Sequence, residues 1–224
     1  MAEQSTFLTK LLLDYKSNPL ILKFRQRRFE LFSSLLRRLP TPVKILDIGG
    51  TQDFWNAMQL TSPDKVSVTL INIFQNRVDH PNFRSVVGDA RKMPEFADKE
   101  FDVVFSNSVI EHVGTFEDQR KMAQEVKRVG KRYFVQTPNR YFPIEPHFLF
   151  PYFQLLPEPA AVKLVQHFNL GWFKKEPDAD KALEVVRSVR LLNNKEMHEL
   201  FSEATFYEEK VGGLIKSIVA HHGF

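Results

Sequence analysis

An apolar segment that ends in an acid and two glycines constrains the fold of this 224-residue chain most strongly. Residues 43–48 (Val-Lys-Ile-Leu-Asp-Ile) lack strict alternation, which predicts a central parallel strand buried on both faces. Asp47 is costly in such an interior unless it is paired, so we place it at the carboxyl end of the strand. Gly49 and Gly50 allow a tight turn and close approach of a ligand. Ligands of open α/β sheets bind at this edge, although an ordinary strand followed by a glycine turn is the alternative.

Composition predicts one sizeable globular domain. Hydrophobic residues make up 43% of the chain, and the mean hydropathy of -0.29 is typical of a soluble protein. No stretch approaches the roughly 18 consecutive apolar residues of a membrane span, and we expect neither a transmembrane segment nor a signal peptide. Cysteine is absent, which excludes disulfides, cysteine-ligated zinc and a cysteine nucleophile and favours a cytoplasmic location. The net charge of +4 is mild and scattered, so nucleic-acid binding is not expected.

Further apolar segments alternate with helical ones along the chain. Strands are predicted at residues 66–71, 83–87, 101–105 and 131–136, and helices near residue 54 and at residues 116–129. This alternation predicts an α/β fold with a doubly wound parallel sheet. After a helix at about residues 193–204, two apolar runs flank Gly212-Gly213 and predict a C-terminal antiparallel hairpin.

Two regions lie outside this rhythm. Residues 1–40 are predicted to form an N-terminal helical cap, whose basic cluster is Lys23, Arg25, Arg27 and Arg28. These charges form either a solvated face or a lid that meets a carboxylate or phosphate of a ligand. Residues 41–224 are predicted to form the main domain, with an insertion at about residues 139–190 that is rich in proline and phenylalanine. Its prolines exclude a regular strand, so we expect an irregular packed segment with short helices.

The strand ends, taken in order, resemble those of the class I S-adenosylmethionine-dependent methyltransferases, and in particular the type 11 methyltransferase domain. Leu46-Asp47-Ile48-Gly49 matches the first motif of that family, although Thr51 and Asp53 stand where further glycines are common. The resemblance covers residues 40–140 and the C-terminal helix and hairpin. It implies a Rossmann-like seven-stranded sheet with S-adenosylmethionine at its carboxyl edge.

The same resemblance assigns cofactor contacts. Asn72 stands where the family has an acid that binds both ribose hydroxyls, and an amide offers only one strong acceptor. Asp89 and Ala90 match the pair that meets the adenine ring, and the loop after residue 105 matches the segment beside the methionine moiety. The implied cofactor set is Asp47, Gly49, Gly50, Thr51, Asn72, Ile73, Asp89, Ala90, Ser106, Asn107 and Ser108.

Acceptor contacts are expected from the insertion. His147 is the first candidate for a general base, oriented by Glu145, although it could merely hydrogen-bond the insertion's own backbone. Arg140 and Tyr141 are further candidates for acceptor contacts. His112 is interpreted as structural or cofactor-lining, and no metal site is expected.

We therefore expect methyl transfer to an oxygen or nitrogen atom of a small molecule, partly apolar or aromatic, by a monomer or homodimer. One alternative is a protein that kept the fold and lost turnover, which the thinned glycine loop and Asn72 suggest. Another is an RNA-modifying methyltransferase, which the basic helix suggests.

Overall fold

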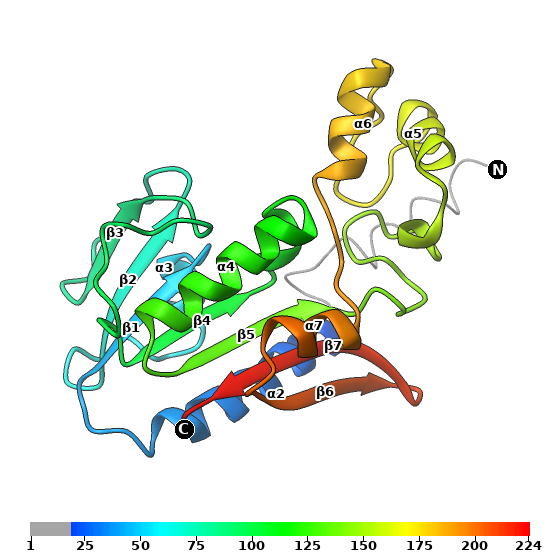
Figure 1. Cartoon of the computed structure of the whole chain (residues 1–224). Helices are drawn as coiled ribbons and strands as arrows, with labels where there is room; N and C mark the ends of the chain where they lie inside the picture. Colours follow the sequence, from blue (N-terminus) through cyan, green and yellow to red (C-terminus); the bar gives the residue numbers. More distant parts are fainter. Residues whose placement is uncertain (1–18) are drawn as a thin grey trace.

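The computed structural model describes residues 19–224, and their side chains from residue 26 onward. A seven-stranded sheet with the order β3-β2-β1-β4-β5-β7-β6 forms its centre (Figure 1). The strands are β1 (Val43–Ile48), β2 (Val66–Asn72), β3 (Phe83–Val87), β4 (Val103–Asn107), β5 (Tyr133–Pro138), β6 (Thr205–Val211) and β7 (Leu214–His222). Strands β1 to β5 pair in parallel, and β7 pairs antiparallel with β5 and β6. The predicted doubly wound α/β sheet with a C-terminal hairpin is confirmed.

Helices cover both faces of this sheet. Helices α4 (Phe116–Val129) and α7 (Asn194–Leu200) lie on one face, and α2 (Pro19–Leu36) and α3 (Gln52–Ala57) lie on the other (Figure 1). Because the central strands are buried on both sides, each face has its own apolar cluster. Many of the phenylalanines belong to the second cluster, where Phe32 of α2 packs against Phe105 and Phe134. None of the described helices is both long enough and apolar enough to cross a bilayer.

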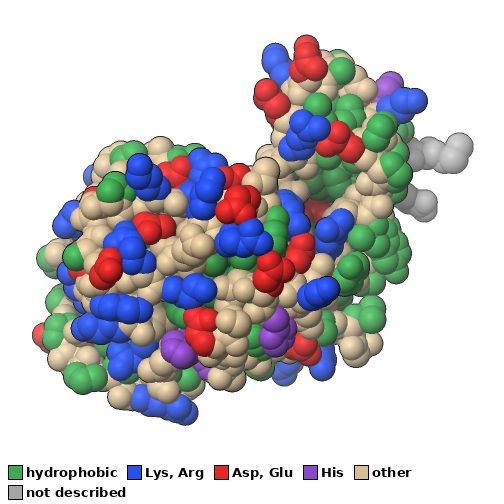
Figure 2. All heavy atoms as spheres, in the orientation of Figure 1, with side chains coloured by type: hydrophobic (Ala, Val, Ile, Leu, Met, Phe, Trp, Pro, Cys, Tyr) green, Lys and Arg blue, Asp and Glu red, His purple; other side chains and the backbone are tan. Residues whose placement is uncertain are grey.

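The chain between β5 and α7 forms a lobe at the carboxyl edge of the sheet (Figures 1 and 2). It contains the short 3₁₀ helix η2 (Phe153–Leu155), α5 (Glu158–His167) and α6 (Ala179–Arg187). A separate apolar cluster that includes Phe148, Phe153 and Ala161 holds the lobe together. Figure 2 shows a hollow between this lobe and the body of the molecule.

Strands β4 and β5 begin later than predicted, at Val103 and Tyr133. Polar residues stand just before both strands: the Asp102 carboxylate accepts hydrogen bonds from the Lys44 backbone N–H and from Lys131 Nζ. Helix α7 ends at Leu200, earlier than residue 204, and its N-terminus carries a capping box between Asn193 and Glu196. These differences are confined to element ends.

Arg28 fixes α2 to the sheet. It is buried, and its Nε and second terminal nitrogen donate to the two oxygens of Glu209 on β6 at 3.0 and 2.8 Å. Its other terminal nitrogen donates to Asn107 Oδ1 at 2.5 Å and to Gln136 Oε1 at 2.6 Å. Burial opposes ionisation of Glu209, but the charge and hydrogen bonds of Arg28 outweigh it and lower the pKa of that carboxyl. This member of the predicted basic cluster thus binds a carboxylate of its own chain.

Candidate functional site

The β1 loop requires both of its glycines. Gly49 has φ +74°, where side chains are strained, and a Cβ there would lie 2.5 Å from Val109. A Cβ on Gly50 would lie 1.7 Å from Asp47 Oδ2. Asp47 is buried beneath this loop and accepts a hydrogen bond from Trp55 Nε1 at 2.7 Å. Burial raises the pKa of Asp47 to about 8. Because its side chain is buried, Asp47 supports the loop from inside the fold.

The end of β2 presents one anchored amide and an apolar surface. Asn72 Nδ2 donates to the Gly50 carbonyl at 2.9 Å, which leaves Oδ1 without a hydrogen bond among the described residues. Ile73 and Phe74 are 80% and 60% exposed, and Val87 at the end of β3 is 54% exposed. We call Ile73, Phe74 and Val87 the apolar shelf. Because these side chains are exposed, a planar apolar group can pack against them.

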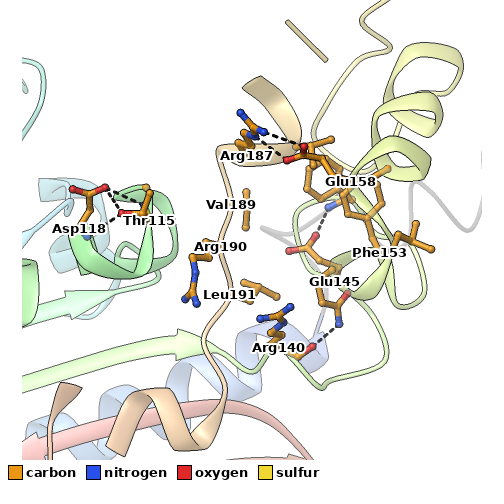
Figure 3. A pocket seen from close by; sticks show the side chains of 16 residues that line it. Thr115, Asp118, Arg140, Glu145, Phe153, Glu158, Arg187, Val189, Arg190 and Leu191 are labelled. Carbon is orange, nitrogen blue, oxygen red and sulfur yellow. Dashed lines mark hydrogen bonds and ion pairs between the residues drawn. The ribbon is translucent and has the colours of Figure 1, made fainter. Parts of the chain in front are cut away.

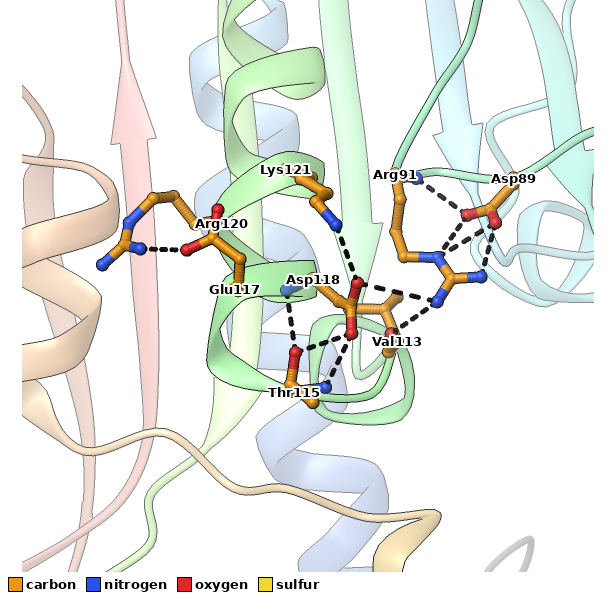
Figure 4. A network of polar contacts seen from close by, with 8 residues as sticks. All are labelled: Asp89, Arg91, Val113, Thr115, Glu117, Asp118, Arg120 and Lys121. Carbon is orange, nitrogen blue, oxygen red and sulfur yellow. Dashed lines mark hydrogen bonds and ion pairs between the residues drawn. The ribbon is translucent and has the colours of Figure 1, made fainter.

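Asp89 is paired within the chain. Its carboxylate accepts from Arg91 Nε at 3.0 Å and from a terminal nitrogen at 2.7 Å, and this pairing lowers the pKa of Asp89 (Figure 4). Arg91 also reaches the Val113 carbonyl at 3.4 Å and Asp118 at 3.9 Å. Both Asp89 and Arg91 are over two-fifths exposed, so a ligand can approach the pair. Sequence reasoning missed Arg91, although a base two residues after the acid was a visible signal.

The side chains after β4 are occupied by other parts of the fold. Ser106 is fully buried and its Oγ has no hydrogen-bond partner. Asn107 accepts from Arg28, and Ser108 Oγ donates to Gln136 Oε1 at 2.9 Å. Ser108 has φ +58°, which turns the backbone sharply here. Asn107 and Ser108 therefore contribute mainly backbone to this edge, while Thr51 and Ala90 are at least partly exposed.

In the lobe, Glu145 orients His147. Both are buried, and His147 Nδ1 lies 2.7 Å from Glu145 Oε1. The other oxygen of Glu145 accepts from the backbone N–H of His147 at 2.7 Å and of Phe148 at 2.6 Å. Burial opposes protonation of His147, but the hydrogen bond and charge of Glu145 outweigh it and raise the pKa of the imidazole.

His147 belongs to a cluster that joins distant parts of the sequence. Its ring meets that of His112 nearly at right angles, with the ring centroids 4.8 Å apart. Glu111, from the 3₁₀ helix η1 (Ile110–His112), is fully buried, and one donor atom from each of Glu111, His112 and His147 lies within 4.8 Å of the others. Burial raises the pKa of Glu111 to about 7. Sequence reasoning missed Glu111, whose signal was an acid next to His112 between apolar residues.

A cavity of about 550 Å³ separates the lobe from the start of α4 (Figure 3). It is lined by Gly114, Thr115, Asp118, Arg140, Glu145, Phe148, Phe153, Gln154, Leu156, Glu158, Ala161, Val186, Arg187, Val189, Arg190 and Leu191. Of the predicted acceptor contacts, Arg140 and Glu145 line it. His147 is buried and hydrogen-bonded to Glu145 but does not line the cavity, and neither does Tyr141, which is 62% exposed. None of the cofactor candidates lines this cavity, but Asp118 of its wall lies 3.9 Å from Arg91, the ion-pair partner of Asp89.

A family model matches part of the body of the molecule. Residues 51–133 match the family model described as Methyltransferase domain. Uncharacterised proteins from two strains of Mycobacterium tuberculosis are 33% identical to the chain over 70 residues. That match covers 31% of the chain and 24% of the relatives, so it spans about a quarter of their length.

Solved structures share the fold at low sequence identity. An S-adenosylmethionine-dependent methyltransferase from Methanosarcina mazei has a TM-score of 0.55 and 15% identity, over 82% of this chain and 92% of that one. The CurJ carbon methyltransferase has a TM-score of 0.57 and 15% identity, over 96% of this chain and 57% of that one. A proposed O-methyltransferase from Nostoc punctiforme has a TM-score of 0.51 and 10% identity, over 95% and 60%. At 10–15% identity their likeness establishes the architecture alone.

Proposed function

The chain carries a class I, S-adenosylmethionine-dependent methyltransferase domain, and on this premise we propose that it methylates an oxygen or nitrogen atom of a small molecule that has an apolar body and an anionic group. The single observation that carries the choice of acceptor is an unpaired arginine in a largely apolar cavity.

The strand-end residues fit the cofactor. The Gly49-Gly50 turn brings backbone to the edge without side chains, as the methionine end of the cofactor needs. Asn72 Oδ1 is a free acceptor for a ribose hydroxyl, and the apolar shelf suits one face of adenine, with Asp89 and Ala90 at its rim. When bound, S-adenosylmethionine supplies an electrophilic methyl group on its sulfonium. The residues of the chain align the acceptor and exclude water from it.

Arg140 supports an anionic acceptor. It lines the cavity, and no hydrogen bond or ion pair joins its guanidinium to the described residues. The two other arginines in the cavity wall are paired, Arg187 with Glu158 at 2.8 Å and Arg190 with Glu196 at 2.5 Å. A free guanidinium binds a carboxylate or phosphate through two parallel hydrogen bonds.

The rest of the wall supports an apolar acceptor body. Phe148, Phe153, Leu156, Val189 and Leu191 are among the apolar side chains that line it. One polar atom stands out among them: Gln154 Oε1 is buried without a hydrogen-bond partner, while its amide nitrogen donates to the carbonyls of Arg140 and Phe142. This oxygen can accept a hydrogen bond from a hydroxyl or amine on the acceptor.

We assign His147 as the residue that takes the acceptor's proton. Glu145 holds its Nδ1, which leaves Nε2 as the nitrogen that exchanges a proton. Positioned proton transfer of this kind typically contributes about 10²–10⁴-fold to a rate. Its hydrogen-bond partner Glu145 lines the cavity, so the imidazole lies one side chain away from the acceptor.

Calorimetry with S-adenosylmethionine and its demethylated product tests the cofactor assignment first. Transfer of a labelled methyl group into metabolite fractions, separated beforehand by charge, tests the acceptor. We expect product in the anionic fractions, and a rise in the acceptor KM of about 10-fold or more for Arg140→Ala, with partial recovery in Arg140→Lys. Arg187→Ala, at a paired arginine of the same wall, is the control. Product confined to neutral fractions would refute the anionic acceptor.

A second candidate is a protein that binds the cofactor without turnover, which Thr51 and Asp53 at positions where the family commonly has glycines, and Asn72 in place of an acid, suggest. Tight binding of S-adenosylmethionine with no labelled product in any fraction would identify that case. No binding at all would refute both functions.

A further inference from the structure

We propose that Glu111, His112 and His147 bind a divalent transition-metal ion. Glu111 and His112 are neighbours in η1, immediately after the loop that follows β4, and His147 reaches them from the lobe. Their donor atoms lie within 4.8 Å of one another. Donor atoms on one zinc ion lie about 3–4 Å apart, given bonds of roughly 2.0–2.2 Å, so an adjustment of about 1 Å brings all three onto an ion.

Each of the three side chains has one atom held by the protein and another left free. His147 Nδ1 is held by Glu145 at 2.7 Å, and His112 Nδ1 lies 3.3 Å from the Ser188 carbonyl. Glu111 Oε2 accepts from Thr137 Oγ1 at 3.0 Å. Metal-binding histidines commonly donate their second ring N–H to a carboxylate or a backbone carbonyl, which fixes the ring and makes the ligand nitrogen more basic. Both histidines here have that arrangement.

The free oxygen of Glu111 is the strongest sign of a missing partner. Oε1 is buried and has no hydrogen-bond partner, in a residue that is 0% exposed. No lysine or arginine side chain among the described residues pairs with Glu111, and Glu145, a second buried carboxylate, stands close by. Buried carboxylates are normally paired with a cation or bound to a metal. A divalent ion would satisfy Oε1 and balance the charge of both acids.

The donor set selects the class of metal. Two imidazoles with one carboxylate occur at catalytic zinc and at non-haem iron(II), whereas magnesium and calcium prefer oxygen donors. Three protein ligands leave at least one coordination position open. His112 is exposed, so solvent can reach the site.

An ion here would lie next to the acceptor cavity. Glu145 and Arg190 line that cavity, and the Arg190 backbone N–H donates to the Glu111 carbonyl at 2.7 Å. An open coordination position could then bind the acceptor oxygen and lower its pKa. That role rests on the proposed function, whereas the binding of the ion does not. With an ion bound, His147 would serve as a ligand and the ion would take over the activation of the acceptor.

The test is a metal titration of the untagged full chain after treatment with a chelator, in the absence of S-adenosylmethionine. Calorimetry with Zn²⁺ and the visible absorption of Co²⁺ are the two measurements. We expect one saturable site, and a loss of affinity of at least about 10-fold in Glu111→Gln and in His112→Gln. His167→Gln is the matched control, because His167 is also exposed and its Nδ1 also contacts a backbone carbonyl, that of Lys163 at 2.8 Å.

His112→Gln keeps the test decisive, since an exposed residue can be changed without unfolding the protein; circular dichroism of the metal-free variants checks this. The absence of saturable Zn²⁺ and Co²⁺ binding would overturn the proposal. Affinities of His112→Gln and Glu111→Gln equal to that of the unmodified chain would do so as well. Binding of S-adenosylmethionine, measured separately, is a different outcome and decides only the proposed function.

Discussion

Two buried glutamates at the carboxyl edge of the sheet have opposite surroundings. Glu209 accepts two hydrogen bonds from the Arg28 guanidinium and one from Ser217, and the charge and hydrogen bonds of Arg28 lower the pKa of Glu209. Glu111 has one bond, from Thr137, and one unpartnered oxygen, and burial raises its pKa to about 7. Both side chains are almost fully buried, so burial alone does not distinguish them.

The difference separates architecture from function. A buried carboxylate whose two oxygens both accept hydrogen bonds from its own chain needs no ligand to satisfy it, and the Arg28–Glu209 pair holds α2 against the sheet. A buried carboxylate with a free oxygen is costly by itself, and it persists where something else completes it. Substitutions at Arg28, Glu209 and Glu111 test this distinction.

The largest effect is expected for Arg28→Met. The substitution leaves the Glu209 charge buried and uncompensated, and it removes the donor to Asn107 and Gln136. Breaking one partner of a buried pair typically costs about 3–5 kcal/mol, which urea denaturation measures directly.

Arg27→Met is the control for that variant, because Arg27 is the exposed neighbour on the same helix and its loss should cost less than about 0.5 kcal/mol. The double variant Arg28→Met with Glu209→Met should recover part of the loss, since both charges leave together. Equal stability of Arg28→Met and Arg27→Met would remove the structural role of the pair.

The two glutamates should respond differently to the same amide substitution. Glu209→Gln leaves the buried Arg28 without a counter-charge, and we expect a loss of about 2–3 kcal/mol. Glu111→Gln keeps an acceptor for Thr137 and strands no cation, so metal-free protein should lose less than about 1 kcal/mol. Chemical denaturation in the presence of a chelator compares the two. A larger loss in Glu111→Gln would mean that its carboxylate already has a structural partner.

The sequence predicted the surroundings of Glu209 no better than those of Glu111. Strand ends are local signals, so the apolar run before Asp47 and the Gly49-Gly50 turn were sufficient to place the edge of the sheet. Arg28 looked like part of a charged helix face because its partner, Glu209, lies at the other end of the chain. Glu111 and His147 likewise meet only through the fold of the lobe. Contacts of this kind depend on chain topology, which periodicity does not contain.

A third buried acid, Asp47, should make the stability of the protein depend on pH. Its folded pKa of about 8 lies above the ordinary value of 3.8, so between these values the folded protein holds a proton that the unfolded chain has released. Stability should therefore be fully present below about pH 4 and should fall as pH rises towards 8, with a slope approaching about 1.4 kcal/mol per pH unit. Asp47→Asn keeps an acceptor for Trp55 and cannot titrate.

Urea denaturation at several pH values between 5.5 and 8 compares the two proteins, and subtracting their free energies of unfolding cancels the other titrating groups. The stability advantage of Asp47→Asn should grow steadily with pH. Parallel curves would mean that Asp47 is ionised in the folded protein and has a partner beyond Trp55.

The smallest effect is expected at Asn72, which shares with Glu111 one anchored end and one free oxygen. The family pattern suggests that Asn72→Asp would strengthen cofactor binding, because an acid accepts from both ribose hydroxyls. The fold indicates the reverse. Asn72 Nδ2 donates to the Gly50 carbonyl at 2.9 Å, and a carboxylate there would face that carbonyl with no proton to share.

We expect Asn72→Asp to lower stability by about 1 kcal/mol and to weaken binding of S-adenosylmethionine severalfold, since the loop that holds the methionine end loses its anchor. Asn72→Ala loses the anchor and the free oxygen together, so it should bind more weakly still. Calorimetry ranks the three proteins. If Asn72→Asp binds S-adenosylmethionine more tightly than the unmodified chain, the oxygen available to the ribose contributes more to binding than the hydrogen bond to Gly50. Hydrogen bonds between a partly satisfied side chain and its own protein would then matter less here than the comparison of Glu209 with Glu111 implies.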